Sequence, residues 1–522
     1  MLQEPEEKSD CSRELNISFG YQCNSNQDNS TKVNCEFELF GGIQIPESNF
    51  KFRSSSFSCL SGAALSANCT LANTNICNGL IGEEILPGLD SPRSFRRLTS
   101  SPSLSSMDLL SSSQSSLSTL GGSMSMDSDM LENNTSLWKS MSAPTKVESS
   151  SFLNAMDVQM AGGAAGEDRV QAVCSEENGW LFCGVYDGFN GRDAADFLAG
   201  TLYENIGFYF HQLEWRIKKQ GESGAPYQYN AFECANDLSS AIGALNIGSQ
   251  QSTYSASDGG ILSEAFRVGV LDCLVRALAQ AESDFMYMVE QSMEDRPDIV
   301  SVGSCVLAVL LHGQELYILN LGDSRAVLAT CDVAENGPLH AIQLTEIHTV
   351  DNEFEYKNLM DSHPDDPSPI VGGRVKGKLK LTRAFGVGYL KKRKLNDALM
   401  GILRVRNLCS PPYVSTHPFT MNRKVSENDL FVVLGSDGLF DFFTNEEVVE
   451  LVHQFIQDNP AGDPAKHLVE LLVLRAAENA GFSIEELMRV PAGRRRKYHD
   501  DVTVIVIMLG NKQRTSTAST SL

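Results

Sequence analysis

The 522-residue sequence lacks the features that mark several classes of protein. Its 13 cysteines are an odd number and include no Cys-x-x-Cys pair, which argues against a disulfide framework and against a zinc site. No hydrophobic run reaches the length of a membrane span, and the run at 302–311 is short enough to be a strand. The acidic residues 1–7 have no apolar core, so we expect no signal peptide and a location in the cytoplasm, the nucleus or both.

Positive charge is also scarce. Lys and Arg total 42 against 66 Asp and Glu, which gives a formal net charge of −24. This acidity argues against nucleic-acid binding and against docking on an anionic membrane, whereas it suits an enzyme that collects divalent cations. We expect the chain to act as a monomer with no nucleic-acid partner and no transmembrane segment.

Composition divides the chain into three parts. Residues 1–150 are rich in Ser, Asn and Gly and lack sustained periodicity, so we predict a mostly disordered region that is dispensable for chemistry. Short apolar pieces at 15–21 and 36–45 are candidates to dock on a folded domain. That domain is predicted to span residues 151–510, with a polar insertion loop at about 220–260, and 511–522 form a polar tail.

Hydrophobic periodicity within 151–510 alternates between strands and helices. Strands are predicted at 170–174, 179–186, 302–312, 315–320, 326–331, 430–435 and 502–509. Helices are predicted at 191–202, 262–289, after Thr444 and at 464–479, and Thr444 with Glu447 forms a capping-box pattern. Strands interrupted by paired helices favour an α+β domain with packed antiparallel sheets and helices outside.

Carboxylates gather at the ends of the predicted strands. Asp187 and Asp437 each follow an apolar strand and precede a glycine, Asp500 comes just before the last strand, and an acidic pair lies at Glu167 and Asp168. Buried carboxylates need cations, and oxygen ligands without His or Cys favour Mg²⁺ or Mn²⁺. Two such cations about 3.5–4 Å apart can hold a bridging hydroxide for attack on a phosphoryl group. A single Asp-Gly pair would more often be an ordinary turn; three strand-end carboxylates favour a metal site.

Seven motifs in order carry a resemblance to a known family. They are Gly166-Glu-Asp-Arg169, Phe182-Cys-Gly-Val-Tyr-Asp-Gly-Phe-Asn-Gly191, Val302-Gly-Ser-Cys305, Asn320-Leu-Gly-Asp-Ser-Arg-Ala326, Leu381-Thr-Arg-Ala-Phe-Gly386, Gly435-Ser-Asp-Gly-Leu-Phe-Asp441 and His499-Asp-Asp-Val-Thr503. This series, spread over about 156–510, resembles the metal-dependent type 2C protein phosphatases, and within them the plant Poltergeist-like subgroup. The resemblance implies a central antiparallel β-sandwich flanked by helices on both sides. It also implies hydrolysis of phosphoserine and phosphothreonine in protein substrates by a metal-bridging hydroxide.

The same resemblance implies roles for individual residues. Asp187 would bridge two ions, either Mg²⁺ or Mn²⁺, with the Gly188 carbonyl on one of them, while Asp437 and Asp500 would complete the other. We take Asp187, Asp437 and Asp500 as the catalytic carboxylates.

Four further carboxylates would take secondary roles. Glu167 and Asp168 would order metal-bound waters. Asp323 and Asp441 match positions that hold a third metal in some members. For Asp323 an equally good alternative is a turn in which the carboxylate caps backbone amides and Arg325 pairs internally. Arg383 is predicted to be mainly a structural ion-pair residue.

Two departures from the family pattern affect the expected chemistry. Phe189 occupies the position of a histidine that would protonate the leaving group, a role worth about 10²–10⁴ in rate, and Asn190 or water would have to assist. The stretch 160–166 contains no phosphate-binding arginine. Arg374, Lys376, Lys378 and Lys380 are candidate substitutes, although a solvated strand face is the favoured interpretation.

The basic run 494–497 offers a positive rim beside Asp500, against the plainer alternative of a solvated surface. The departures also leave two other functions open: a weakly active relative that binds phosphoproteins as a scaffold, and a hydrolase for small phosphate esters.

Overall fold

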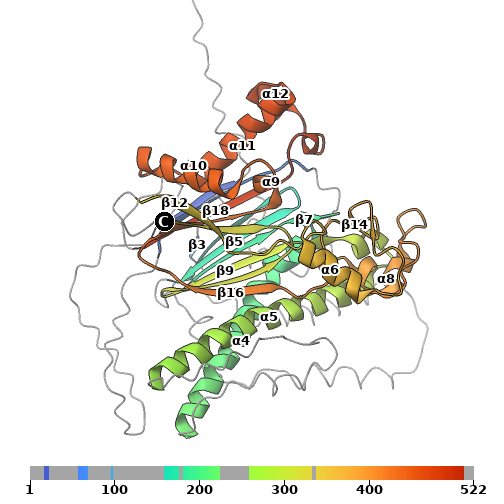
Figure 1. The fold of residues 1–522 in the computed structure, drawn as a ribbon, viewed down its shortest axis with the longest axis horizontal. Coiled ribbons are helices and arrows are strands. Elements are labelled where there is room, and N and C mark those ends of the chain that lie inside the picture. Colours follow the sequence, from blue (N-terminus) through green and yellow to red (C-terminus); the bar gives the residue numbers. More distant parts are fainter. Residues whose placement is uncertain are drawn as a thin grey trace, which may run out of the picture.

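The computed structural model describes residues 17–22, 57–68, 96–97, 158–175, 180–223, 258–331 and 337–510. Two antiparallel β-sheets lie face to face, with long helices on the outer face of each (Figure 1). The first sheet has the order β1 (Ile17–Gln22), β2 (Phe57–Leu65), β18 (Val502–Leu509), β17 (Asp429–Gly435), β11 (Arg325–Cys331) and β12 (Leu339–Gln343). The second has the order β16 (Phe419–Lys424), β10 (Glu315–Leu321), β9 (Val306–His312), β6 (Trp180–Tyr186), β5 (Asp168–Ser175), β4 (Val158–Ala165) and β3 (Arg96–Arg97).

Helices cover both sheets. Figure 1 shows α4 (Asp193–Ser223) and α5 (Asp258–Ser292) under the second sheet, and α10 (Asn445–Asp458) and α11 (Pro464–Ala480) over the first. The shorter elements are α6 (Glu353–Ser362), α7 (Gly388–Lys391), α8 (Arg393–Ala398), α9 (Asp437–Phe440), α12 (Ile484–Arg489), β7 (Gly188–Phe189), β8 (Gly303–Ser304), β13 (Ile370–Val371), β14 (Arg374–Val375) and β15 (Phe385–Gly386). The predicted class, an antiparallel sandwich with helices on both sides, is confirmed. None of the helices that the structure describes combines the length and apolar character needed to cross a bilayer.

The central strands are apolar on both faces because each face is covered. In β6, Trp180 and Phe182 pack with α4 and α5, whereas Leu181, Cys183 and Val185 point into the space between the sheets. Alternate side chains of a strand leave opposite faces, so a continuous apolar run is what a doubly covered strand requires. β18 follows the same rule, with its even-numbered residues 502–508 toward α10 and α11 and its odd-numbered residues 505–509 toward the second sheet.

Several predicted elements agree with the structure and some are longer. The predicted strand 170–174 lies within β5, and the helix 191–202 lies mostly in α4, which continues to Ser223. The ends of the predicted insertion loop at about 220–260 belong to α4 and α5, and the rest of it, 224–257, lies outside the described residues. Thr444 caps α10 as predicted, since its hydroxyl accepts the Glu447 N–H at 3.2 Å and the Glu447 carboxylate accepts the Thr444 N–H at 2.9 Å.

The predicted domain boundary at 151 differs from the structure. β2 pairs with β18 from Phe57 to Leu65, and all nine of its residues are buried. β1 pairs with β2 and overlaps the apolar piece at 15–21. The strand is built from small residues, Ser-Cys-Leu-Ser-Gly-Ala-Ala, so its composition resembles that of the Ser-rich region around it. The piece at 36–45, the tract 100–128 and the tail 511–522 lie outside the described residues.

Candidate active site

Four chain segments bring the predicted carboxylates to one end of the sandwich. The start of β5 pairs with the end of β6, which places the turn carrying Glu167 and Asp168 beside Asp187. The end of β17 pairs with the start of β18, which places Asp437 beside Asp500. Each pair comes from one of the two sheets, so the cluster spans the gap between them.

Glycines at two positions allow the backbones to meet. A Cβ on Gly188 would lie 2.3 Å from the Glu167 carbonyl oxygen, and one on Gly438 would lie 2.1 Å from the Asp501 carbonyl oxygen. Both contacts are far inside van der Waals distance and involve backbone atoms that cannot turn away. The Asp-Gly pairs are therefore required by close chain approach, and the glycine after each aspartate is part of the site's construction.

Burial and mutual repulsion act on the clustered carboxylates. Burial raises the pKa of Asp187 well above its usual range, and the charges of Asp168, Asp437, Asp323 and Asp500 raise it further. Burial likewise raises the pKa of Asp168 and of Asp437 well above the ordinary aspartate value, in each case with help from neighbouring carboxylates. An arrangement that repels itself in this way is stabilised when cations neutralise it.

The residues fit a divalent cation by the chemistry of their oxygens. Glu167 Oε2 and Asp168 Oδ1 are buried and have no hydrogen-bond partner within the described part of the chain. The other oxygen of Asp168 accepts a hydrogen bond from the Thr503 hydroxyl at 2.8 Å, which fixes the carboxylate's orientation. Unpaired buried carboxylate oxygens are costly, and hard cations such as Mg²⁺ and Mn²⁺ prefer oxygen ligands.

Asp323 faces the same cluster. Ligand atoms of Asp187, Cys305 and Asp323 all lie within 4.8 Å of one another, and the Cys305 thiol donates to Asp323 Oδ1 at 3.2 Å. Burial raises the pKa of Asp323, and the charge of Asp441 raises it further. Arg325 does not form a close ion pair with Asp323; its guanidinium donates to Asn445 Oδ1 at 3.3 Å and lies 4.9 Å from the Phe440 ring centre.

Arg169 fixes the turn that carries the acidic pair. The guanidinium is fully buried and donates to the Gly166 and Asp168 carbonyl oxygens at 3.0 and 2.6 Å. Its Nε forms a short ion pair with Asp196 in α4. The arginine of the Gly-Glu-Asp-Arg motif thus ties the turn to the helix behind it.

We expect Arg169→Met to lower the free energy of unfolding by about 3–5 kcal/mol, because a buried pair that loses one partner leaves an uncompensated charge. Urea denaturation measures the change. Lys466→Met is the matched control, because Lys466 forms a partly exposed pair with Glu470 on α11 and its loss should cost no more than about 1 kcal/mol. Equal losses in the two variants would contradict the role given to Arg169.

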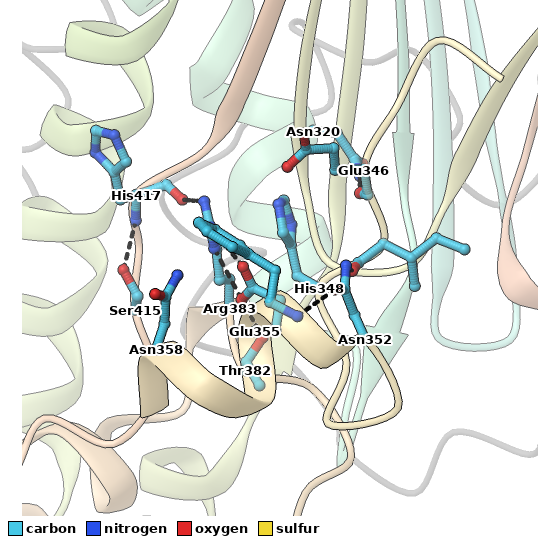
Figure 2. A network of polar contacts seen from close by, with 12 residues as sticks. Asn320, Glu346, His348, Asn352, Glu355, Asn358, Thr382, Arg383, Ser415 and His417 are labelled. Carbon is cyan, nitrogen blue, oxygen red and sulfur yellow. Dashed lines mark hydrogen bonds and ion pairs between the residues drawn. The ribbon is translucent and has the colours of Figure 1, made fainter. Parts of the chain in front are cut away.

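A polar network supports the Asp323 turn from the side of α6 (Figure 2). Arg383 donates from Nε to Glu355 Oε2 at 3.0 Å and from Nη2 to Oε1 at 2.5 Å, which confirms the predicted structural ion pair. His348 Nδ1 accepts the Gly322 N–H at 3.1 Å. Burial lowers the pKa of His348 to about 3, so the ring is neutral and can accept this hydrogen bond.

Phe189 and Asn190 are held by structural contacts. The Phe189 ring packs over Gly303, where an added Cβ would lie 2.6 Å from its Cζ. Asn190 has φ 60° and donates from Nδ2 to the Ser301 carbonyl at 3.1 Å. A phenyl ring has no proton to give, and the Asn190 amide uses one of its two hydrogens on a backbone carbonyl.

The candidate cations differ in their surroundings. Lys376 is buried in an ion pair with Asp366 at 2.8 Å, so the interpretation of this residue as part of a solvated strand face is wrong. Lys380 is exposed and pairs with Asp351 at 2.8 Å. Burial raises the pKa of Asp441, and the charge of Lys380 only partly opposes this rise. Arg496 is half-exposed and lies 3.9 Å from Glu167 Oε2 and 3.5 Å from Asp500 Oδ2. The basic run 494–497 therefore touches the carboxylate cluster.

Sequence reasoning missed Asn68 and Asp501, which lie beside the cluster. Asp501 accepts N–H groups from Ala67, Asn68 and Glu167, and the Asn68 amide also reaches Asp500. The adjacent residues Asp500 and Asp501 could have indicated a second role, because side chains of neighbouring residues before a strand point in different directions. Nothing local marks Asn68.

Comparison with known proteins shows the family to which the chain belongs. Residues 148–481 match the family model described as Protein phosphatase 2C. The chain is 60% identical over 511 residues to "Probable protein phosphatase 2C 39" of Oryza sativa subsp. japonica, covering 97% of this chain and 94% of that protein. It is 57% identical over 520 residues to "Probable protein phosphatase 2C 40" of Arabidopsis thaliana, covering 99% of each.

Among solved structures, the serine-threonine phosphatase 2C from Toxoplasma gondii is similar with a TM-score of 0.41 and 17% identity, covering 68% of this chain and 95% of that chain.

Proposed function

Because this chain belongs to the protein phosphatase 2C family and is a metal-dependent serine/threonine protein phosphatase, we propose that the cluster at the end of its sandwich is the active site. The observation that carries the proposal is a set of carboxylates whose pKa values are raised by burial and further by one another's charges. In the same set, Glu167 Oε2 and Asp168 Oδ1 accept no hydrogen bond within the described residues. Bound cations would relieve the cost of ionising such a set at neutral pH. Asp187, Asp437 and Asp500 are the proposed metal ligands, with the Gly188 carbonyl.

The remaining carboxylates take supporting positions. Glu167 and Asp168 lie on the side of the second sheet, where their unpaired oxygens can bind water that surrounds the metals. Asp323 follows β10 and Asp441 follows α9, the charge of Lys380 acts on both, and they are the proposed ligands of a third ion. We propose Mg²⁺ or Mn²⁺ for all positions, since every ligand is an oxygen.

The cations and the protein side chains have different roles in the proposed reaction. When bound, the cations supply charge neutralisation to the phosphoryl group and activate water as the nucleophile. The charges of Asp168 and Asp437 both act on the Asp187 carboxyl, so Asp187 is the carboxylate that we propose would contact both metal positions. Arg496 at the rim adds a positive charge that attracts a phosphorylated side chain toward the cluster.

The proposed function also includes the substrate, the oligomeric state and the compartment. The substrate is a phosphorylated protein, and we propose that the chain acts on it as a monomer. Cys183, Cys305, Cys331 and Cys409 are free cysteines, which supports a reducing compartment such as the cytoplasm or the nucleus.

Phosphate release from a phosphothreonine peptide by the full chain tests the proposal. We expect release with Mn²⁺ or Mg²⁺, none after EDTA, and recovery when Mn²⁺ is restored, because the carboxylates bind substrate only through cations. A nucleotide and a sugar phosphate assayed beside the peptide serve as controls and should be poor substrates. Metal-dependent peptide binding without release would contradict the proposed catalysis, and preference for the small esters would contradict the substrate class.

A further inference from the structure

The end of β2 reaches the carboxylate cluster from a distant part of the sequence. The backbone N–H groups of Ala67 and Asn68 donate to Asp501 Oδ1 at 2.6 and 2.9 Å. The Asn68 side chain donates from Nδ2 to Asp501 Oδ2 at 2.9 Å and to Asp500 Oδ1 at 3.1 Å. Nδ2 carries two hydrogens, so one amide group can serve both aspartates at once.

Asp501 is fully occupied by these donors. Besides Ala67 and Asn68, the Glu167 N–H donates to its Oδ2 at 2.8 Å. A Cβ on Gly166 would lie 2.2 Å from the same oxygen, so the turn before the acidic pair closes directly on this carboxylate. Four N–H groups on one buried carboxylate make Asp501 a structural anion, which leaves Asp500 as the member of the pair that is available to a metal.

The contacts of Asp500 are uneven between its two oxygens. Oδ1 accepts the Asn68 amide at 3.1 Å and the Asp501 N–H at 2.8 Å, whereas Oδ2 lies 3.5 Å from Arg496 Nη2. One oxygen is therefore held by two donors and the other has a longer contact with a half-exposed side chain. Two donors on one oxygen fix the plane of the carboxylate.

We infer that Asn68 is a positioning residue for the metal centre: its amide holds Asp500 in the orientation that presents Oδ2 to the cation. The inference rests on the proposed function, because it takes Asp500 as a ligand. Partners that orient a ligand from behind typically change metal affinity or activity by about 10–100-fold when removed. Docking of β2 thus contributes to metal binding as well as to the sheet.

The β2 segment is anchored at this point by a further contact. The Gly493 N–H donates to the Ala67 carbonyl at 2.6 Å, which joins the end of β2 to the loop before the basic run 494–497. Asn68 itself is buried. The amide therefore has little freedom, and its hydrogen bonds to Asp500 and Asp501 are set by the position of the strand.

Mn²⁺ binding to the full chain, measured by titration calorimetry, tests the inference. We expect Asn68→Ala to raise the Mn²⁺ dissociation constant by about 10–100-fold, and to raise the Mn²⁺ concentration for half-maximal phosphate release by a similar factor. The matched control is Asn396→Ala, because Asn396 in α8 is also buried and its amide also makes two backbone hydrogen bonds, to Val405, away from the cluster. This control should lose stability and keep wild-type Mn²⁺ affinity.

The outcomes separate the inference from the proposed function. Wild-type affinity in a folded Asn68→Ala protein would overturn the role of Asn68 while leaving the metal site in place. Absence of Mn²⁺ binding by the wild-type chain would instead overturn the proposed site. Should Asn68→Ala not fold, Asn68→Ser decides the question, because one hydroxyl hydrogen can serve only one of the two aspartates. A folded Ser variant should bind Mn²⁺ at least several-fold more weakly, and equal affinity would overturn the inference.

Discussion

The Asp187→Asn variant is expected to release phosphate at least about a thousandfold more slowly than the wild-type chain, which corresponds to about 4 kcal/mol of lost transition-state stabilisation. Burial raises the pKa of Asp187, and the charges of Asp168, Asp437, Asp323 and Asp500 raise it further, so this carboxylate interacts with every part of the cluster. An amide of the same shape removes the negative charge that would hold two cations. Adding excess Mn²⁺ should not restore the rate.

The same substitution should have the opposite effect on stability in EDTA. The pKa of Asp187 is raised on folding, so its contribution to stability is lost as the pH rises from the ordinary aspartate pKa toward the raised one. At neutral pH the metal-free wild-type chain bears this cost and the asparagine variant does not. We therefore expect a higher melting temperature for Asp187→Asn in EDTA, and a smaller gain from added Mn²⁺.

Steady-state phosphate release and thermal melting with and without Mn²⁺ measure both effects. Asp361→Asn is the control, because Asp361 is exposed on α6 and its substitution should change neither quantity. A rate within tenfold of wild type would remove Asp187 from the metal site. A melting temperature in EDTA that falls, rather than rises, would show that the carboxylate serves the fold instead.

A chain that begins at residue 151 is expected to be insoluble or unfolded, in contrast to the prediction that residues 1–150 are dispensable for chemistry. It would lack β2, whose Phe57, Leu60 and Leu65 are buried and together contribute roughly 5–9 kcal/mol. That amount is comparable to the whole stability of a typical domain. Loss of β2 would also expose the long apolar edge of β18, and such edges promote aggregation.

An internal deletion provides the matched control for this truncation. Removing residues 104–148 takes out part of the same N-terminal region but keeps β2, so this variant should fold and release phosphate at near the wild-type rate. Circular dichroism, gel filtration and phosphate release compare the two. Adding a peptide of residues 55–69 to the 151–522 chain during refolding should recover part of the activity, because it can replace the strand. A well-folded, fully active 151–522 chain would contradict the importance of β2.

The parts of the fold with strong local signals are the ones that the sequence predicts. β6 and β17 are continuous apolar runs, and the Asp-Gly pair that follows each run is enough to place a carboxylate at the strand end. β4 escapes prediction because Val158–Ala165 is rich in Gly and Ala and has no alternating pattern. The prediction that Lys376 is solvent-exposed fails because a lysine among alternating polar residues resembles a solvated strand face. Its buried partner, Asp366, lies ten positions away in the sequence.

The site is predictable to the extent that it lies at strand ends. Asp168, Asp187, Asp437 and Asp500 each adjoin a strand, so their positions follow from the sheets. Asn68 cannot be found in the same way, because its partners Asp500 and Asp501 are 432 and 433 positions along the chain. Pairing over such a separation leaves no mark on the residues nearby.

Because β2 pairs with β18, the first sheet cannot be completed until the C-terminal strand has been synthesised. The Ala67 N–H and its acceptor on Asp501 are 434 positions apart, among the first and the last parts of the domain to leave the ribosome. At about 5–20 residues per second, translation leaves roughly 20–90 s between them. For that interval β2 has no β18 to pair with and Asp500 has not been made. The nascent chain therefore carries β2 with its β18 side uncovered until the end, and catalysis begins only when the C-terminal strand is released.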